Sequence, residues 1–240
     1  MESARFSYKK SVLAILIMFF CIGLFGCTIE NGLKSNDYGI FISNAYIEEK
    51  VDKVKSSEGY VVADEISSNF LDALVAVEDN RFYKHGGVDF KAIIRSVVAN
   101  VRAKSVVQGG STITQQLAKN LFLNGNQDVS RKIREIVIAR KLEKLYSKEK
   151  ILELYANIVY YGNGYYGINN ASYGYFNSAP KNLTLNQGSL LAGLLQAPNS
   201  YNPKKHLNKA KARQQEVLDA MLQYGYITKE QMESVLSKGN

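Results

Sequence analysis

The stretch FLDALVAVEDNRFYKHGG, residues 70–87, places a dense group of ionisable and aromatic side chains directly after an apolar run. The apolar run predicts a helix that buries Leu74 and Val77 and ends near Glu78 and Asp79, before a turn. A carboxylate at such a helix exit, with apolar neighbours, is partly desolvated, and desolvation raises its pKa towards the range of a useful proton acceptor. The simpler interpretation is that these ionisable residues lie on an ordinary solvated surface.

Size and charge limit the possible folds and partners. The chain has 240 residues, of which 46% are hydrophobic, and this is enough for one compact domain with an appendage. The formal net charge is +8, and residues 131–150 alone hold eight basic and three acidic residues. This concentration of positive charge favours an anionic partner, for which nucleic acid, a phosphorylated substrate and an acidic membrane surface all qualify. A solvated helix face is the alternative.

The N-terminal stretch has the features of a membrane anchor. Basic residues precede residues 11–29, a run of 19 residues without charge that is long enough to cross a bilayer as a helix. Positive charge before the run predicts a cytoplasmic N-terminus, with the remaining chain on the extracytoplasmic face of the membrane. Residues 24–27 loosely resemble a lipoprotein cleavage site ending at Cys27, but we favour an uncleaved anchor at residues 1–29. Because Cys21 and Cys27 are the only cysteines, packing must stabilise the rest of the chain.

The rest of the chain divides into a tether and a helical domain. Residues 30–57 are polar, show no strong helical period and are predicted to form the tether, and residues 58–240 are predicted to form one domain. Residues 160–176 hold six tyrosines and four glycines, and are either a sugar-stacking loop or a flexible connection. Helices are predicted where apolar residues recur every three or four positions, in residues 90–101, 133–145 and 151–155.

A second dense stretch, GGSTITQQLAKN at residues 109–120, has the features of a helix N-terminus. Its two glycines permit a tight turn, and Thr112 and Gln115 have the spacing of a capping box. Free N–H groups and the positive end of the helix dipole attract an anion there, and Lys119, about two turns later, adds a full charge. An ordinary capped helix is the alternative interpretation.

A third stretch, RKIRE at residues 131–135, is rich in charge. Its spacing puts Arg131 and Glu135 on one face of a helix, four positions apart. Taken alone, this pattern indicates no more than a surface ion pair worth a few tenths of a kcal/mol.

As a set, these stretches resemble the glycosyltransferase domain that polymerises bacterial peptidoglycan, family 51 of the glycosyltransferases. This domain occurs alone in monofunctional enzymes and fused in bifunctional penicillin-binding proteins. The resemblance covers roughly residues 60–205. Residues 78–87 fit the family motif E-D-x-x-F-x-x-H-x-G, residues 110–120 fit G-S-T-I-x-Q-Q-x-x-K-N, and residues 131–135 fit R-K-x-x-E. Residues 150–157 fit K-x-x-I-L-E-x-Y-L-N, apart from the spacing before Ile151 and alanine at position 156 in place of leucine. Residues 191–203 fit the fifth motif, but just before it Gln187 and Ser189 stand where the family has a glutamate and an alanine.

The resemblance implies a mainly α, lysozyme-like, two-lobed domain whose jaw lobe dips into the membrane. In this family the lipid-linked growing glycan is the donor, and the 4-hydroxyl of lipid II attacks its anomeric carbon with inversion, releasing polyprenyl diphosphate. By resemblance Glu78 is the general base, and Glu135 either organises nearby cations and a divalent metal (Mg or Mn) or assists the leaving group. No nucleotide cofactor is needed. The substrate-binding positions implied in the same way are Asp79, Phe82, His85, Gly110, Ser111, Thr112, Gln115, Gln116, Lys119, Asn120, Arg131, Lys132, Glu153 and Asn157, of which Ser111, Gln116, Lys119, Arg131 and Lys132 match residues that line the donor pyrophosphate.

The predicted helix at residues 90–101 bears on the jaw lobe. Its apolar stripe is surrounded by Lys91, Arg95 and Arg102. Such a pattern suits a helix at a membrane interface that reaches lipid II, and a helix that faces a protein core has the same pattern.

The partners and location that the resemblance implies are those of cell-wall synthesis. They are lipid II, the lipid-linked nascent glycan and the bacterial cytoplasmic membrane, with penicillin-binding proteins or divisome and elongasome proteins as further candidates, and no nucleic acid. The family's inhibitor moenomycin is expected to bind. About 35 residues follow Pro203, too few for a transpeptidase domain, so we expect a single-pass, monofunctional enzyme. Two other classes stay open: a lysozyme-like lytic enzyme with Glu78 as general acid, and a catalytically silent scaffold that binds cell-wall precursors or synthases.

Overall fold

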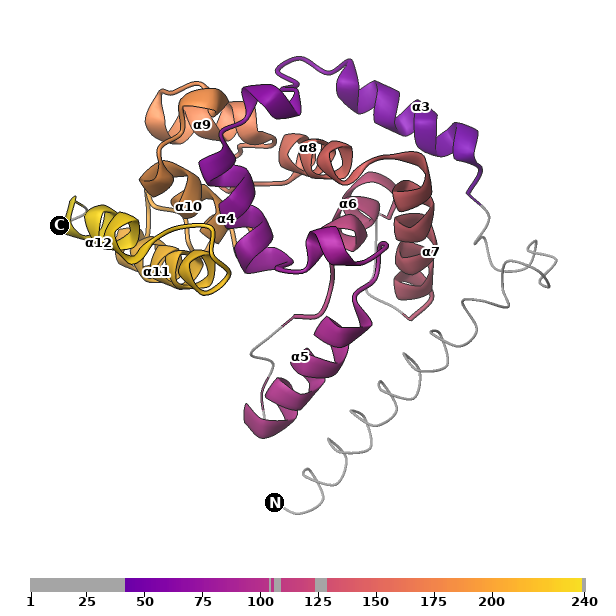
Figure 1. Cartoon of the computed structure of the whole chain (residues 1–240). Coiled ribbons are helices and arrows are strands. Elements are labelled where there is room, and N and C mark those ends of the chain that lie inside the picture. Colours follow the sequence, from indigo (N-terminus) through magenta and orange to yellow (C-terminus); the bar gives the residue numbers. More distant parts are fainter. Residues whose placement is uncertain (1–41, 104, 106–108, 124–128, 239–240) are drawn as a thin grey trace.

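Helices form nearly all of the regular structure that the computed structural model describes, which covers residues 42–103, 105, 109–123 and 129–238 (Figure 1). These residues contain no strand, only isolated β-bridges between Gly86 and Val88 and between Tyr160 and Tyr166. The predicted mainly α fold class is therefore confirmed. The elements in chain order are α3 (Asn44–Lys55), η1 (Ala63–Glu65), α4 (Ser68–Glu78), η2 (Phe82–Lys84), α5 (Phe90–Ala103), α6 (Ile113–Phe122), α7 (Val129–Leu145), α8 (Lys148–Ile158), α9 (Ile168–Phe176), η3 (Pro180–Asn182), α10 (Leu185–Leu194), α11 (Leu207–Gln223) and α12 (Lys229–Lys238).

The core forms around α4, the helix that the opening apolar run predicted. Phe70, Ala73 and Leu74 are fully buried, and α4 packs against α10 and α11. Glycine at position 188 lets α10 approach α4 closely, because a Cβ atom on Gly188 would lie 2.8 Å from the backbone nitrogen of Phe70. The helices predicted at residues 90–101, 133–145 and 151–155 are confirmed as parts of α5, α7 and α8.

The helix α3 lies where an irregular tether was predicted. The side chain of Ser43 caps its first turn by accepting a backbone hydrogen bond. Ile47 and Val51 are fully buried, and the helix packs against α7 and α8. Only these two side chains, one turn apart, enter the core completely, which is too few for an apolar period to stand out in the sequence. Residues 44–55 thus belong to the folded domain.

The tyrosine-rich residues 160–176 form a turn and the helix α9, folded against the end of α8. Tyr161 is fully buried and donates a 3.1 Å hydrogen bond to the carbonyl oxygen of Ala156. Tyr175 donates a 3.0 Å hydrogen bond to the carbonyl oxygen of Tyr161. Gly167 has a φ of 78°, and a Cβ atom on it would lie 2.5 Å from a carbonyl oxygen of α8, so this turn requires glycine. The interpretation as a mere flexible connection is therefore wrong for these tyrosines, which pack the fold.

The helix α5 projects away from the other described helices (Figure 1). Ile93 on one face packs with Val88 and Ile136 in a small cluster that is separate from the main core. A neighbouring face of the helix leaves large apolar side chains exposed, at Phe90, Ile94, Val98 and Val101. None of the described helices has both the length and the apolar content needed to cross a membrane. The anchor predicted at residues 1–29 lies outside the described residues.

Candidate active site

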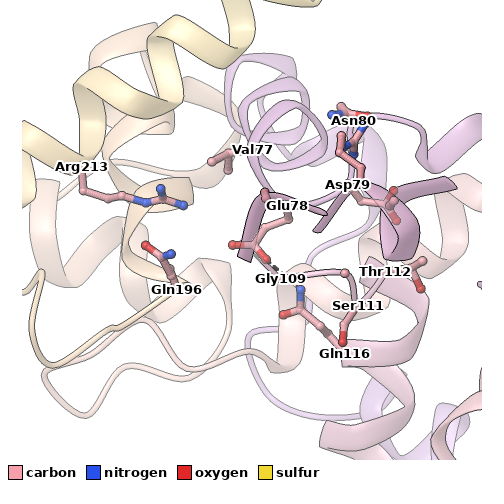
Figure 2. Close-up of a pocket in the computed structure, with 14 residues that line it drawn as sticks. Val77, Glu78, Asp79, Asn80, Gly109, Ser111, Thr112, Gln116, Gln196 and Arg213 are labelled. Atoms are coloured by element: carbon pink, nitrogen blue, oxygen red, sulfur yellow. Dashed lines mark hydrogen bonds between the residues drawn. The ribbon is translucent and has the colours of Figure 1, made fainter. Parts of the chain in front are cut away.

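A cleft of about 490 Å³ opens between α4, α5 and α11. Figure 2 shows Glu78 on one side of it and Arg213 and Gln196 on the other, with their polar ends directed into the space between them. The lining residues come from the exit of α4, one face of α5, the segment that enters α6, the chain after α10, and α11: Val77, Glu78, Asp79, Asn80, Ala92, Arg95, Ala99, Gly109, Gly110, Ser111, Thr112, Gln116, Gln196 and Arg213. The cleft therefore combines one inward-facing carboxylate with cationic and amide groups.

Glu78 reaches the cleft because α4 ends at this residue. Asp79 leaves the helical conformation, with φ at −156° and ψ at 72°, so the chain turns directly after Glu78. The Glu78 side chain is partly exposed and accepts a 2.7 Å hydrogen bond from the side-chain amide of Gln116 on α6. The helix end predicted near Glu78 and Asp79 is confirmed.

The surroundings of Glu78 make it a stronger proton acceptor than a carboxylate in water. Loss of hydration raises the pKa of the Glu78 carboxyl, and the neighbouring charge of Asp79 adds to this effect. The hydrogen bond from Gln116 and the positive charges of Arg213 and Lys119 offset the rise only in part. A raised pKa is what a general base near neutral pH requires.

Asp79 points away from Glu78 and into the fold (Figure 2). Its carboxylate accepts a 3.1 Å hydrogen bond from the N–H of Ile113, the first residue of α6, and lies 2.9 Å from the Nε2 atom of His85. The side chains of Asp79 and His85 are almost fully buried, and Phe82 is fully buried. Asp79 and His85 thus hold the start of α6 against the exit of α4, and the ring of Phe82 packs beside His85 in the core. The assignment of these three residues to substrate binding stays a prediction.

The capping box predicted at the start of α6 is confirmed. Thr112 accepts a 3.1 Å hydrogen bond from the N–H of Gln115, and the Gln115 side chain accepts a 3.0 Å bond from the N–H of Thr112. The Thr112 hydroxyl also donates to the carbonyl oxygen of Gly87 at 2.6 Å. Because the N–H groups of Ile113 and Gln115 already have partners, the prediction of free N–H groups for an anion is wrong at these two positions. Ser111, directly before this helix start, has an exposed polar side chain.

One of the predicted donor-site cations reaches the edge of the cleft. The ammonium group of Lys132 on α7 donates to the Ser111 hydroxyl at 2.9 Å and forms an ion pair with Glu135. Glu135 is buried, and its ion pair holds the side chain of Lys132, three positions earlier on α7, in place. The positive charge of Lys119 on α6 lowers the pKa of the Glu78 carboxyl.

Glu153 and Asn157, which the resemblance assigned to substrate binding, bind the chain ahead of α4. Glu153 accepts a 2.9 Å hydrogen bond from the N–H of Ala63 and another from the hydroxyl of Tyr60. Asn157 accepts from the N–H of Val61 and donates to its carbonyl oxygen, both at 2.8 Å. Neither residue lines the cleft. Both hold the segment before α4 against α8.

Asn120, another residue predicted to contact the substrate, is exposed on α6 and does not line the cleft.

The arrangement of the described residues does not fit the divalent metal predicted near Glu135. The Glu135 carboxylate is bonded to the ammonium group of Lys132, which a metal ion would have to displace. Elsewhere in the described part of the chain, Asp79, His85 and Asp89 bring three potential ligand atoms together. Asp89 already binds a guanidinium at 2.8 Å and two N–H groups at the start of α5, and Asp79 binds the start of α6. The carboxylates of Asp79 and Asp89 therefore stabilise the starts of α6 and α5.

Sequence reasoning missed Arg213, which forms the far wall of the cleft with Gln196. Arg213 lies on α11, is 9% exposed, and pairs with Glu216 at 2.5 Å. The sequence does hold a signal for Arg213, because Ala210, Arg213 and Val217 have the spacing of one helix face. Ala210 and Val217 are apolar and buried, so the same spacing predicts that Arg213 is buried too. An arginine on the buried face of an otherwise solvated helix indicates a buried polar site.

Comparison with known proteins identifies the relatives of this chain. A family model described as Transglycosylase matches residues 45–222. Penicillin-binding protein 1A of Aquifex aeolicus is 47% identical over 179 residues, and penicillin-binding protein 1F of Bacillus subtilis is 45% identical over 179 residues, each match covering 75% of this chain and 25% of the relative. A crystal structure of penicillin-binding protein 1A from Haemophilus influenzae matches 74% of this chain and 17% of that chain, with 23% identity and a TM-score of 0.44. Because this chain spans about a quarter of the length of these two curated relatives, the expectation of a monofunctional enzyme stays a prediction.

Proposed function

This chain belongs to the transglycosylase family, and we propose that it is a peptidoglycan glycosyltransferase. In the proposed reaction it transfers the lipid-linked growing glycan to the 4-hydroxyl of lipid II and releases polyprenyl diphosphate, with inversion at the anomeric carbon. The observation that carries the proposal is the desolvated carboxylate of Glu78, which faces a cleft whose opposite wall is formed by Arg213 and Gln196.

Glu78 is the general base of the proposed reaction. It accepts the proton of the 4-hydroxyl while that oxygen forms its bond to the anomeric carbon of the donor. Because inversion needs a single displacement, the acceptor hydroxyl is itself the nucleophile and no sugar becomes attached to the protein. A glycosidase places two carboxyl groups across the scissile bond. Here the adjacent carboxylate, Asp79, is directed into the fold, which disfavours the lytic alternative.

The cations near Ser111 are the proposed contacts of the departing pyrophosphate. Lys132 is held at the cleft edge by Ser111 and by the buried Glu135, and Arg131 precedes it on α7. Lys119 on α6 contributes its charge from the neighbouring helix. Charge-assisted hydrogen bonds from such groups strengthen as negative charge develops on the leaving group, so they stabilise the transition state more than the bound donor.

The lipid tails of donor and acceptor require the protein to work at a membrane surface, and α5 supports this part of the proposal. Its exposed apolar side chains recur every three or four residues, with exposed fractions of 43% for Phe90, 60% for Ile94, 43% for Val98 and 44% for Val101. Basic residues accompany this stripe, an arrangement typical of interfacial helices. Arg95 and Ala92 on the same helix line the cleft, so a lipid-bound α5 would bring the membrane surface next to Glu78. We place the domain on the extracytoplasmic face of the bacterial cytoplasmic membrane.

The proposal is tested by incubating the detergent-solubilised full chain with lipid II alone and separating the products by gel electrophoresis. Glycan polymer is the expected product. Binding of lipid II without turnover would support the scaffold alternative and overturn the proposal. Release of soluble fragments from purified sacculi, in place of polymer from lipid II, would identify a lytic enzyme.

A further inference from the structure

A buried tyrosine on α8 lies behind the proposed general base. The hydroxyl of Tyr155 donates a 2.8 Å hydrogen bond to the Oε1 atom of Gln116. The Nε2 atom of the same amide donates a 2.7 Å hydrogen bond to the Oε2 atom of Glu78. Tyr155 is fully buried, so bulk water does not replace Gln116 as the partner of its hydroxyl. The three side chains form a continuous chain of hydrogen bonds from α8 through α6 to the exit of α4.

This chain of hydrogen bonds has a fixed direction when Glu78 is ionised. A carboxylate only accepts hydrogen bonds, so Gln116 must present its NH₂ group to Glu78. The amide oxygen then faces Tyr155, which must donate. If the amide turned over, its oxygen would face Glu78, and only a protonated carboxyl can bond to it. The orientation of the Gln116 amide is therefore linked to the protonation state of Glu78.

We propose that Tyr155 is a positioning residue of the transfer reaction, whose hydroxyl fixes the Gln116 amide in the orientation that donates to Glu78 and so keeps the base ionised. The catalytic consequence rests on the proposed function, whereas the link between hydroxyl, amide and carboxylate rests on the geometry. In a buried site each hydrogen bond of such a chain polarises the next and strengthens it. Tyr155 thus acts on the base without touching the substrate.

Other charged groups also shift the pKa of Glu78, so a test of Tyr155 must leave these groups unchanged. Removing the Tyr155 hydroxyl leaves all of them in place, so a change in the titration of Glu78 can be assigned to the amide. Burial holds the pKa of Tyr155 well above its usual value, so the tyrosine stays neutral between pH 5 and pH 9. Among the described residues, the charged groups that face Glu78 or line its cleft are Arg213 on α11, Lys119 on α6, Arg95 on α5 and the adjacent Asp79, and Lys132 lies at the cleft edge.

The variant Tyr155→Phe tests the proposal, with Tyr161→Phe as a matched control. Tyr161 is an equally buried tyrosine, and its hydroxyl donates to a backbone carbonyl. We expect Tyr155→Phe to lower kcat/KM for lipid II at pH 7 by about 2- to 12-fold, the factor that corresponds to one lost hydrogen bond. The acid limb of its pH–rate profile should move to higher pH, because Glu78 loses support for its ionised form. Tyr161→Phe should leave the acid limb at its original pH.

A double-variant experiment identifies the route of the effect. Gln116→Ala alone should move the acid limb to higher pH, and adding Tyr155→Phe should not move it further, because the amide that transmits the effect is gone. Gln116→Ala also tests the link between amide and base if Tyr155→Phe does not fold, which thermal unfolding would reveal. An acid limb that Tyr155→Phe leaves unchanged, or that Tyr161→Phe moves equally, would overturn the proposal.

A second measurement does not depend on lipid II turnover. Infrared difference titration follows the Glu78 carboxyl band, which is identified by its absence in Glu78→Gln. The titration midpoint should be higher in Tyr155→Phe than in Tyr161→Phe. A parent protein that makes no polymer would refute the proposed function, whereas equal midpoints in the two phenylalanine variants would refute the role of Tyr155 whatever the polymerisation assay shows.

Discussion

Replacing Glu78 with glutamine is expected to remove the chemistry and to stabilise the fold. The glutamine amide has the size of the carboxyl group, and its oxygen can accept the 2.7 Å hydrogen bond that Gln116 donates. The side chain should therefore stay in place, but it cannot take the proton of the 4-hydroxyl. Loss of a general base typically costs a factor of about 10²–10⁴ in rate, and we expect lipid II polymerisation to fall by that factor.

The gain in stability follows from the raised pKa of Glu78. Because folding raises the pKa of this carboxyl, the folded state binds the proton more tightly than the unfolded chain does. Stability is therefore lost as the pH rises from the unfolded pKa, about 4.3, through the folded pKa. At pH 7.5 the ionised carboxylate costs about 1.4 kcal/mol of folding free energy for each unit by which its pKa is raised. Glutamine does not ionise, so the unfolding temperature should rise by about 2–4 °C for each kcal/mol recovered.

Gel assays of polymer and thermal unfolding at pH 7.5 and pH 4 measure the two effects of Glu78→Gln separately. The difference in unfolding temperature should shrink at pH 4, where the carboxyl is largely protonated in both states. Glu58→Gln, at an exposed turn, is the matched control and should change neither quantity. A polymerisation rate close to that of the parent would show that Glu78 is not the base. A lower unfolding temperature at pH 7.5 would show that the cleft does not desolvate this carboxyl.

The cation site, the helix α5 and the packing of α10 on α4 each give one more test. Lys132→Ala should reduce polymerisation by about 10- to 100-fold, the factor for a lost charge-assisted hydrogen bond, and should weaken binding of the donor-site inhibitor moenomycin. The control is Lys144→Ala, at an exposed position near the other end of α7. Equal effects of the two substitutions would contradict a specific site at Lys132. Ile94→Glu combined with Val98→Glu should slow lipid II turnover more in bilayers than in detergent, and equal slowing in both would argue against an interfacial α5. Gly188→Ala should lower the free energy of unfolding by about 1–3 kcal/mol in a denaturant titration, because the added Cβ atom meets the α4 backbone; an unchanged value would mean that α10 can shift.

Local sequence patterns were sufficient for those parts of the site that a single element defines. The end of α4 at Glu78 and the capping box of Thr112 and Gln115 depend on residues within one or two turns, and both are confirmed. The far wall of the cleft depends on a different kind of contact. Arg213 reaches the cleft only because α11 packs on α4 and α10, and such packing between segments far apart in the chain leaves no local pattern that places the guanidinium beside Glu78.

Motif matching did not show which neighbours the selected residues contact. Within the single motif on α8, Glu153 and Asn157 bind the segment before α4, whereas Tyr155 between them reaches Gln116 in the cleft. Successive helix positions face different neighbours, and only the packed structure shows which neighbour each has. A motif records that residues occur together, whether they bind substrate or hold the fold.

The adjacent carboxylates at the end of α4 have opposite roles because the helix stops between them. The extended φ of Asp79 sends its side chain into the fold, where it binds the N–H of Ile113 and the ring of His85. If both carboxylates faced the cleft, the charge of Asp79 would oppose ionisation of Glu78 more strongly than it does now, and the start of α6 would lose its acceptor. Because Ile113 begins the helix that also carries Gln116, Asp79 fixes the position of the residue that donates a hydrogen bond to Glu78. One turn therefore both exposes the proton acceptor and aligns its partner, which is a physical reason for two acids to follow an apolar run.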